Sequence, residues 1–392
     1  LLSTLKCFMK QIFNLLLLII LPLLISCGGG GGSSSSPEET PNPIVNDPRP
    51  TINTWPDTTW KIEDPSRVNM DSLKLEQAIN YAFAEGRNTQ ALIVIRFGVI
   101  VAEKYADGKD QFSLATSWST AKSFTSALFG LAIEQGLINS VDEKACNYLS
   151  EWDCNEVVCL SLDCPKSRGE ISIRDILEMR SGLEDENIGG LSIYTAADDQ
   201  LFFALNRKGE NTPGTKFLYS NSDSMILSGI LETATGMSAK EFAERNLFSA
   251  IGMNGDWWRD KENHTMTYCC IDATSRDFAR FGLLFARNGM WRNDQIIQAQ
   301  WVDDSTSPAE GLDYYGLHWW TYPSTGFFAS QGLHTNDIWI NQSLDLVVVR
   351  NSEFTRFGSD SMRTGSNIHS TKAPDSWNNT EFLTYITDSI NQ

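Results

Sequence analysis

The sequence predicts an α/β fold of the α+β type, with an antiparallel sheet flanked by helices and an inserted all-helical subdomain. Three features of the 392 residues lead to this prediction: β-rich runs early in the chain, helical patterns in the middle, and strands again in the last third. Strands that enclose a helical segment predict that the two ends of the chain meet in one mixed or antiparallel sheet. We expect a functional site at the seam between this sheet and the helices.

Strands are predicted at both ends of the globular part. Residues 91–108, ALIVIRFGVIVAEKYADG, contain two β-rich runs around Phe97 and Gly98 and predict a hairpin. The last third holds the segments GLHWWTYP, GFFASQG, DIWINQ and LDLVVVRN, with turn residues between them. An apolar helix is expected after the hairpin, from Ser119 to near Gly136.

The middle of the chain, residues 171–245, is predicted to be largely helical. Its segments ISIRDILEMRSGL, DDQLFFALNRKG and SDSMILSGILETATG have apolar residues three and four apart. Another amphipathic helix, residues 273–289, closes on a glycine. The expected organisation is a leader at 1–27, a tether at 28–56 and a globular domain at 57–392, with a sheet part at about 66–118 and 270–392 and a helical part at about 123–268.

The N-terminal segment predicts export. Residues 9–27, MKQIFNLLLLIILPLLISC, have a lysine, a short apolar stretch and a terminal Leu-Ile-Ser-Cys. The apolar stretch is shorter than the roughly 20 residues that a membrane-spanning helix prefers, although a plain transmembrane anchor stays open as an alternative. The ending resembles a bacterial lipobox, in which Cys27 is lipidated. With the Gly/Ser/Pro-rich tether that follows, this predicts a lipid-anchored protein on the periplasmic side of the cell envelope, at the outer membrane.

Composition excludes several classes of partner. The formal net charge is −18 and 41% of residues are hydrophobic, so a packed core is expected and binding to phosphate backbones is not. The four histidines lack the spacing of a metal motif, and no glycine-rich loop that would cradle a phosphate is present. The sequence therefore predicts neither a metal nor an organic cofactor.

The cysteines predict disulfides. Apart from Cys7 and Cys27 there are six, an even number that suits an exported protein. We expect Cys154, Cys159 and Cys164 to staple a loop within one acidic stretch. The adjacent pair at 269–270 is expected to have separate partners or to stay as free thiols. The six are Cys146, Cys154, Cys159, Cys164, Cys269 and Cys270.

Ser119 and Lys122 predict a nucleophile and its proton acceptor. Residues three apart share one face of a helix, and the N-terminal end of a helix favours negative charge on the serine oxygen. A desolvated lysine can be neutral and take the serine proton. The alternative is a capping serine followed by a surface lysine, because Ser-x-x-Lys also occurs by chance, as at residues 3–6.

A second polar group of residues, Tyr219-Ser220-Asn221, stands directly before another apolar helix. Residues two apart project to the same side of an extended segment. A tyrosine next to a cationic lysine can lose its proton and act as a base, and an asparagine can hold either the substrate or the lysine by hydrogen bonds. The alternative is a simple turn before a helix cap.

Four segments together resemble the serine β-lactamase-like hydrolase family: SWSTAKSFTSALFGLAIEQGLI, ISIRDILEMRSGL, PGTKFLYSN and DATSRDFARFGLLFARNGMW. The likeness runs over about residues 66–351 and is strongest to the 6-aminohexanoate-dimer hydrolase branch. It implies a β-lactamase/transpeptidase-like fold. It also implies that Ser119 is the acylated nucleophile, Lys122 its proton partner, Tyr219 the general base and later acid, and Asn221 a substrate-positioning residue.

The sequence departs from this family at the third motif. Members with lactamase or peptidase activity carry Lys-Thr/Ser-Gly on a strand that lines the site, whereas the matching strand GFFASQG has no lysine. Recognition of a substrate carboxylate is weakened accordingly. We expect a backbone N–H of this strand, at Ser330, to complete the oxyanion site, and residues 332–336 to form the next turn. Trp118 is expected to wall the pocket and His334 to contact the substrate.

The expected function is a serine hydrolase that acts through an acyl-enzyme on an ester or amide bond. Its partners would be a small ester or amide substrate and, through Cys27, the membrane. A cell-wall D-Ala-D-Ala carboxypeptidase or a β-lactamase is the alternative within the same enzyme class. From another class, the alternative is a catalytically silent envelope protein that binds or senses a ligand.

Overall fold

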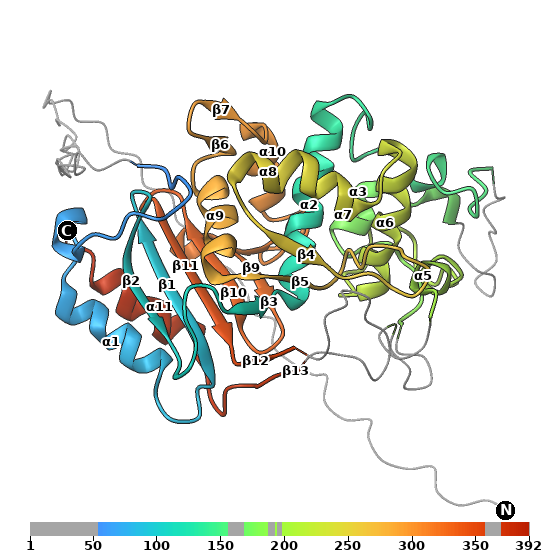
Figure 1. Ribbon diagram of the computed structural model, residues 1–392. Coiled ribbons are helices and arrows are strands. Elements are labelled where there is room, and N and C mark those ends of the chain that lie inside the picture. The colour runs from blue at the N-terminus through green and yellow to red at the C-terminus, as the bar shows by residue number, and fades with distance from the viewer. Residues whose placement is uncertain (1–53, 156–167, 187–192, 194–197, 357–369, 392) are drawn as a thin grey trace, which may run out of the picture. The chain divides into compact units, whose positions relative to one another are not determined.

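The central element of the fold is a six-stranded antiparallel sheet (Figure 1). The computed structural model describes residues 54–155, 168–186, 193, 198–356 and 370–391. In sheet order, the strands are β2 Val99–Tyr105, β1 Thr89–Arg96, β11 Leu346–Ser352, β10 Asn336–Asn341, β9 Phe327–Gly332 and β8 Trp320–Tyr322. Because β1 pairs antiparallel with β11, the prediction that the two ends of the chain meet in one sheet is confirmed.

The predicted N-terminal hairpin is confirmed. Strands β1 and β2 are joined at Phe97 and Gly98, which have φ values of 50° and 77°. A two-residue turn with positive φ at both positions matches the right-handed twist of the strands that it joins. Glycine at the second position adopts this conformation without steric cost.

Helices cover both faces of the sheet. Successive apolar side chains of a strand point to opposite faces, so they belong to two separate apolar clusters. Leu92 and Val94 pack against α1 and α11 on one face, whereas Ile93 and Ile95 belong to the cluster shared with α2 and α9 on the other. Figure 1 shows α1 and α11 on one side of the sheet and α9 on the other. These helices are α1 Ser72–Ala82, α2 Ala121–Glu134, α9 Ser275–Ala286 and α11 Asn379–Asp388.

The middle of the chain is largely helical, as predicted. The helix α6 begins after its N-cap Ser220 and ends before Gly236, whose φ of 67° suits a glycine. The other α-helices whose bounds the structure describes in this part are α3 Ile173–Leu177, α5 Gln200–Leu205, α7 Ala239–Ala243 and α8 Ser249–Ile251, with a π-helical turn at Glu244–Phe248; α10 Ala299–Thr306 follows α9.

Three small sheets were not predicted, because their strands of two to four residues carry too little alternation to be detected. The largest has the order β3-β5-β4 and pairs the segment before α2 with two segments that lie between α8 and α9. The strands are β3 Leu114–Thr116, β4 Gly255–Trp257, β5 Ile271–Thr274, β6 Met290–Trp291, β7 Asp294–Gln295, β12 Phe354–Thr355 and β13 Ser370–Thr371.

The disulfides correct two expectations. Cys154 is bonded to Cys146, across eight residues, and not to a cysteine of its own acidic stretch. Cys269 and Cys270 are bonded to each other, so the expectation of separate partners or free thiols was wrong. That expectation assumed an ordinary peptide between them, whereas their peptide bond is cis. Cys159 and Cys164 lie outside the described residues.

The leader, with Cys27, and residues 28–53 of the tether also lie outside the described residues. Among the helices that the structure describes, none is both long and apolar enough to cross a membrane.

Candidate active site

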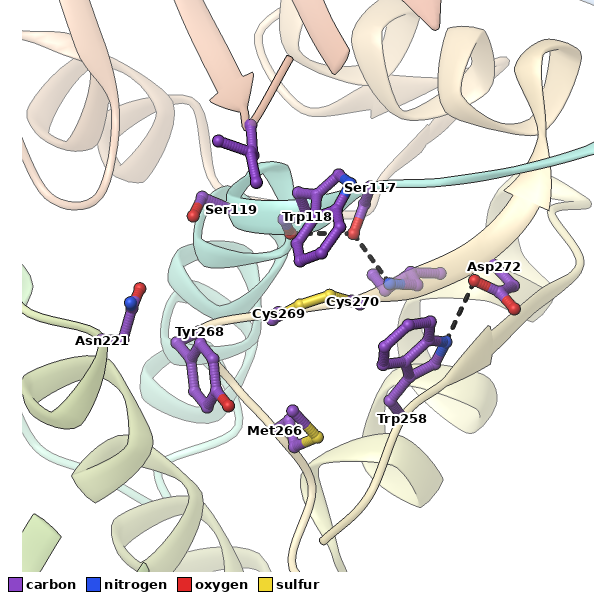
Figure 2. The surroundings of a disulfide bond; sticks show 12 residues. Ser117, Trp118, Ser119, Asn221, Trp258, Met266, Tyr268, Cys269, Cys270 and Asp272 are labelled. Atoms are coloured by element: carbon purple, nitrogen blue, oxygen red, sulfur yellow. Dashed lines mark hydrogen bonds between the residues drawn. A yellow bond between two sulfur atoms is a disulfide. The ribbon is translucent and has the colours of Figure 1, made fainter. Parts of the chain in front are cut away.

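Ser119 lies in a short 3-10 turn, Trp118–Thr120, that leads directly into α2. The α-helix therefore begins two residues later than predicted. Ser117 fixes the start of the turn to β5, because its N–H donates to the Ile271 carbonyl at 2.9 Å and its hydroxyl accepts from the Ile271 N–H at 2.7 Å (Figure 2). The nucleophile candidate is thus held at the N-terminal end of a buried helix, where the first N–H groups have no intrahelical partner.

Lys122 is buried, with only 2% of its surface exposed. The alternative of a surface lysine is therefore wrong. Its Nζ lies 3.1 Å from the Ser119 hydroxyl oxygen, 2.7 Å from Asn221 Oδ1 and 3.0 Å from the Tyr268 carbonyl oxygen. Burial lowers the pKa of Lys122 to about 7, although the negative charge of Glu186 opposes this change.

These three contacts suit a neutral amine. A neutral lysine has two N–H donors and one lone pair. Asn221 Oδ1 and the Tyr268 carbonyl are both acceptors, so they take the two N–H groups. The lone pair is then left facing the Ser119 hydroxyl, which can donate to it. The geometry accordingly prepares Lys122 to receive the serine proton.

Tyr219 lies close to the same amine. The Lys122 nitrogen is 4.9 Å from the centre of the Tyr219 ring. Burial raises the pKa of Tyr219 to about 12, and the hydrogen bond with Ser119 offsets this rise only in part. At neutral pH the phenol therefore keeps its proton. Of the two bases considered from the sequence, the electrostatics favour the lysine over a tyrosinate.

Asn221 is the first residue of α6, directly after the N-cap Ser220. The expectation of a turn before a helix cap describes Ser220 correctly, because its hydroxyl accepts from the Asp223 N–H. The neighbouring Asn221 instead reaches the amine of Lys122. Of the two roles that the sequence left open for Asn221, the structure shows contact with the lysine.

The sequence analysis missed Glu186. Its carboxylate accepts hydrogen bonds from Asn221 Nδ2 at 3.1 Å, the Ser220 hydroxyl at 3.0 Å and the Ser222 N–H at 2.5 Å. It stands in the acidic stretch EDEN, where no motif or periodicity distinguishes it from its neighbours. No signal in the sequence would have found it.

Strand β9 runs along the nucleophile turn, as predicted for the strand of the third motif. The Ser330 hydroxyl donates to the Thr120 carbonyl at 2.9 Å. Gly332 approaches so closely that a Cβ at this position would lie 2.2 Å from the Ser117 carbonyl oxygen. The predicted turn at 332–336 is confirmed, since β9 ends at Gly332 and pairs there with Asn336. The oxyanion role of the Ser330 N–H stays a prediction.

Trp118 and His334 meet at a residue that the sequence did not indicate. The Trp118 indole donates to Thr371 Oγ1 at 2.8 Å, and His334 Nδ1 lies 2.7 Å from the same oxygen. Both side chains are only half-buried. Their expected contacts with a substrate stay predictions.

Aromatic side chains extend the site away from the amine. Trp320 stacks on Tyr219 with ring centres 5.8 Å apart, and Tyr315 meets both rings edge-on. Trp257, Trp258 and Trp319 are completely buried in the core, whereas Trp320 is half-buried beside the site.

The vicinal disulfide lies close to the nucleophile turn. Figure 2 shows Cys269 and Cys270 beneath Ser117 and Trp118, between the segments that carry Tyr268 and β5. The residue before the disulfide supplies the carbonyl that accepts from Lys122, and the residue after it holds Ser117.

The described residues contain no group of three or more His, Cys, Asp or Glu side chains that could hold a metal ion. His318 is buried and its ring contacts Ser224 Oγ at 2.9 Å and the Leu177 carbonyl at 2.7 Å. Burial, followed by the charge of Lys122, lowers the pKa of His318 to about 3, so this histidine is a neutral structural residue.

Comparison with known proteins identifies the family. The sequence profile of the beta-lactamase family matches residues 76–364. The chain belongs to the beta-lactamase family. Homologues in this family are serine hydrolases, amidohydrolases and esterases among them, and they share the β-lactamase/transpeptidase-like fold. The fold class and the enzyme class expected from the sequence are thereby confirmed.

Individual relatives are distant. The chain is 20% identical to a 6-aminohexanoate-dimer hydrolase of Paenarthrobacter ureafaciens over 297 residues, which are 68% of this chain and 73% of that protein. A Salmonella enteritidis protein provisionally named a D-alanyl-D-alanine carboxypeptidase is 26% identical over 214 residues, about half of each chain (49% and 49%).

Solved structures agree on the fold. A Bacillus anthracis protein provisionally named a 6-aminohexanoate-dimer hydrolase superposes with a TM-score of 0.60 at 22% identity, covering 77% of this chain and 82% of that one. EstCE1, described as a hydrolase with promiscuous acyltransferase activity, superposes with a TM-score of 0.60 at 12% identity, covering 82% of this chain and 98% of that one.

Proposed function

We propose that this protein hydrolyses an ester or a small amide through an acyl-enzyme on Ser119. The observation that carries the proposal is the placement of Lys122, whose buried nitrogen lies 3.1 Å from the Ser119 hydroxyl and is held by two carbonyl oxygens. A serine hydroxyl needs such a base because it is a weak nucleophile while protonated.

The chemical steps follow from these contacts. The Lys122 lone pair takes the Ser119 proton as Oγ attacks the substrate carbonyl carbon. The resulting oxyanion would rest against the Ser119 N–H and a backbone N–H of β9, with each donor contributing about 3–4 kcal/mol. When the intermediate collapses, the bond to the leaving group breaks and the leaving oxygen or nitrogen takes a proton from Lys122 through the Tyr219 hydroxyl. Water then attacks the acyl-Ser119 ester by the same route in reverse, which frees the acid and restores the serine.

The strand that matches the third motif lacks a lysine, which favours neutral substrates over those that carry a carboxylate. The strand β9 has no lysine at its end. Arg350 does approach the turn at 332–336, but its guanidinium donates to the carbonyls of His334 and Thr335. It is thus engaged in holding the turn. This supports an esterase or small-amide hydrolase over a D-Ala-D-Ala carboxypeptidase or a β-lactamase.

We also propose that the protein is anchored in the cell envelope by a lipid on Cys27. The proposal rests on the leader and on the Gly/Ser/Pro-rich tether. Expression of the full chain in a bacterial host tests it, with Cys27→Ser as the control. We expect the unsubstituted chain in the outer-membrane fraction and the variant in the periplasmic fraction. Equal distribution of the two would contradict the proposal.

A side-by-side screen tests the catalytic proposal. The purified protein is assayed with p-nitrophenyl esters, a short amide oligomer, a D-Ala-D-Ala peptide and nitrocefin, with Ser119→Ala as the control. We expect turnover of esters or the amide oligomer and little of the last two. If nitrocefin or the D-Ala-D-Ala peptide is the best substrate, the substrate assignment is wrong. If the folded protein turns over nothing and forms no covalent adduct, a silent binding protein is the better description.

A further inference from the structure

Glu186 is a buried carboxylate next to the catalytic groups, with 6% of its surface exposed. Three donors converge on it from the N-cap and the first two residues of α6. They are the Ser220 hydroxyl, Asn221 Nδ2 and the Ser222 N–H, at 3.0, 3.1 and 2.5 Å. The carboxylate of Glu186 therefore occupies the N-terminal end of the helix that supplies Asn221. A negative charge is favourable at this end of a helix.

These contacts determine which way the Asn221 carboxamide faces. An ionised carboxylate only accepts hydrogen bonds, so the group that Asn221 turns toward Glu186 must be its NH2. The amide oxygen then faces the Lys122 nitrogen, 2.7 Å away. Without the carboxylate, nothing in these contacts would prevent the opposite orientation, in which an N–H would point at the lysine.

The carboxylate is itself held in place by a buried network. Ser220 Oγ, which donates to Glu186, also lies 3.2 Å from an Arg207 nitrogen, and Arg207 pairs with Asp223 at 2.6 Å. Arg207 and Asp223 are both buried and neutralise each other. The positive charge of Arg207 is thus paired with Asp223 and not with the Glu186 carboxylate, which lies in a buried environment of low dielectric constant where charges act strongly.

We propose that Glu186 is a positioning residue of the catalytic site: it orients the Asn221 carboxamide so that the oxygen accepts from Lys122, which leaves the lysine lone pair facing Ser119. The inference rests on the proposed function. One donor and one acceptor of the carboxamide are used in these contacts, and the second N–H of Asn221 stays available to a substrate.

The charge of Glu186 gives this role a measurable signature. Its negative charge raises the pKa of Lys122 and that of Tyr219. Removal of the charge therefore lowers both values, and the acidic limb of the pH profile moves to lower pH. The other groups that face or act on Lys122 are Ser119, Asn221, Tyr219, Tyr268 and His318.

The test is Glu186→Gln, assayed with the ester or amide that the native enzyme turns over. Two donors, the Ser220 hydroxyl and the Ser222 N–H, meet Oε2, so the glutamine oxygen is expected at that position and its NH2 opposite Asn221. That NH2 cannot accept from Asn221, so the Asn221 carboxamide is expected to rotate and present an N–H to Lys122. We expect kcat to fall about 10- to 100-fold, in line with the effect of a small misplacement of a catalytic group, with little change in KM. The acidic limb of kcat/KM is expected to shift to lower pH.

Two further variants make the result decisive. Glu186→Asp keeps the charge but shortens the side chain, so it should lower kcat without moving the acidic limb. The second is the double variant Glu186→Gln with Asn221→Ala. Its kcat should be little lower than that of Asn221→Ala alone, because the two residues act through one contact. The matched control is Glu103→Gln on the edge strand β2, where Glu103 forms a partly buried ion pair with Arg276. Loss of this ion pair should leave kcat and the acidic limb of the pH profile unchanged.

Three outcomes overturn the proposal. An active, folded Glu186→Gln with unchanged kcat would do so, and so would a fall in kcat without a shift of the acidic limb. If Glu186→Gln does not fold, a Glu186→Asp variant with native kcat would overturn it instead. Failure of the proposed function looks different, since the native protein itself would then show no Ser119-dependent turnover.

Discussion

Helix α2 has two regions that differ in what surrounds them. Its first turn carries Lys122, whose nitrogen contacts three oxygen atoms. The body of the helix is buried as far as Ala132: Phe124 stacks on Phe281 of α9 with ring centres 3.6 Å apart, and Leu128 belongs to the same core. One helix thus joins the chemistry to the core.

The difference explains how a lysine comes to be a base at neutral pH. The apolar body fixes the helix in the core, and this keeps the first turn away from water. Burial then lowers the pKa of Lys122 to about 7, while the nearby oxygen atoms satisfy its hydrogen bonds. Substitutions in the two regions should accordingly affect different quantities. Those in the first turn should lower turnover, and those in the body of the helix should lower the free energy of unfolding.

The largest effect is expected for Ser119→Ala. Loss of the nucleophile should lower kcat by about 10⁴- to 10⁶-fold, as found when the nucleophile of a serine hydrolase is removed. The thermal midpoint should change by little, because the side chain is small and only partly buried. Steady-state kinetics and thermal unfolding check both parts. Residual turnover above one-hundredth of the native value would show that another residue is the nucleophile.

Lys122→Met should come next. Methionine fills a similar volume but cannot take a proton, so kcat should fall by about 10²- to 10⁴-fold. The free energy of unfolding should stay the same or rise, because burial of the amine disfavours its charged form. Urea denaturation together with kinetics measures this pair of effects. A large loss of stability would mean that the lysine serves the core and not the chemistry.

The pH dependence of the native enzyme tests the same residue without substitution. Since Lys122 acts as a base only when neutral, and its pKa is about 7, kcat/KM should fall about tenfold for each pH unit below 7. Tyr219, with a pKa of about 12, should add no limb in the neutral range. An acidic limb near pH 4 or near pH 10 would contradict this assignment.

Phe124→Ala sharpens the comparison from the other side. Removal of a buried phenylalanine should cost about 3–5 kcal/mol of unfolding free energy. The rings that pack on Phe124 belong to Phe248, Trp257, Phe278 and Phe281, none of which holds the Lys122 nitrogen, so turnover per folded molecule should stay within about twofold of the native value. Activity should be measured well below the lowered thermal midpoint. A loss of kcat comparable to that of Lys122→Met would show that the two regions are not separable.

The sequence allowed the main sheet and the core of the site to be predicted, for identifiable reasons. The hairpin of β1 and β2 has two long β-rich strands and a turn at Phe97-Gly98. Ser119, Lys122, Tyr219 and Asn221 occur in spaced motifs, so residue type and position pointed to one site. The base was less certain, because whether the lysine or the tyrosine loses its proton depends on burial.

What the sequence could not show depends on contacts between distant segments. Glu186 matters only because the fold brings it to the start of α6. Nothing in the local sequence of Trp320 indicates that its ring stacks on Tyr219. The bond between Cys269 and Cys270 was rejected because an ordinary peptide was assumed.

Covalent labelling of Ser119 as a function of pH tests the central claim most directly. A fluorophosphonate reacts with an activated serine, and intact-protein mass spectrometry followed by peptide mapping locates the adduct. The account predicts one adduct, on Ser119, whose rate of formation falls as the pH is lowered through about 7, and none in Ser119→Ala. A folded protein that stays unlabelled, or one labelled at Ser119 at the same rate from pH 5 to pH 9, would contradict it.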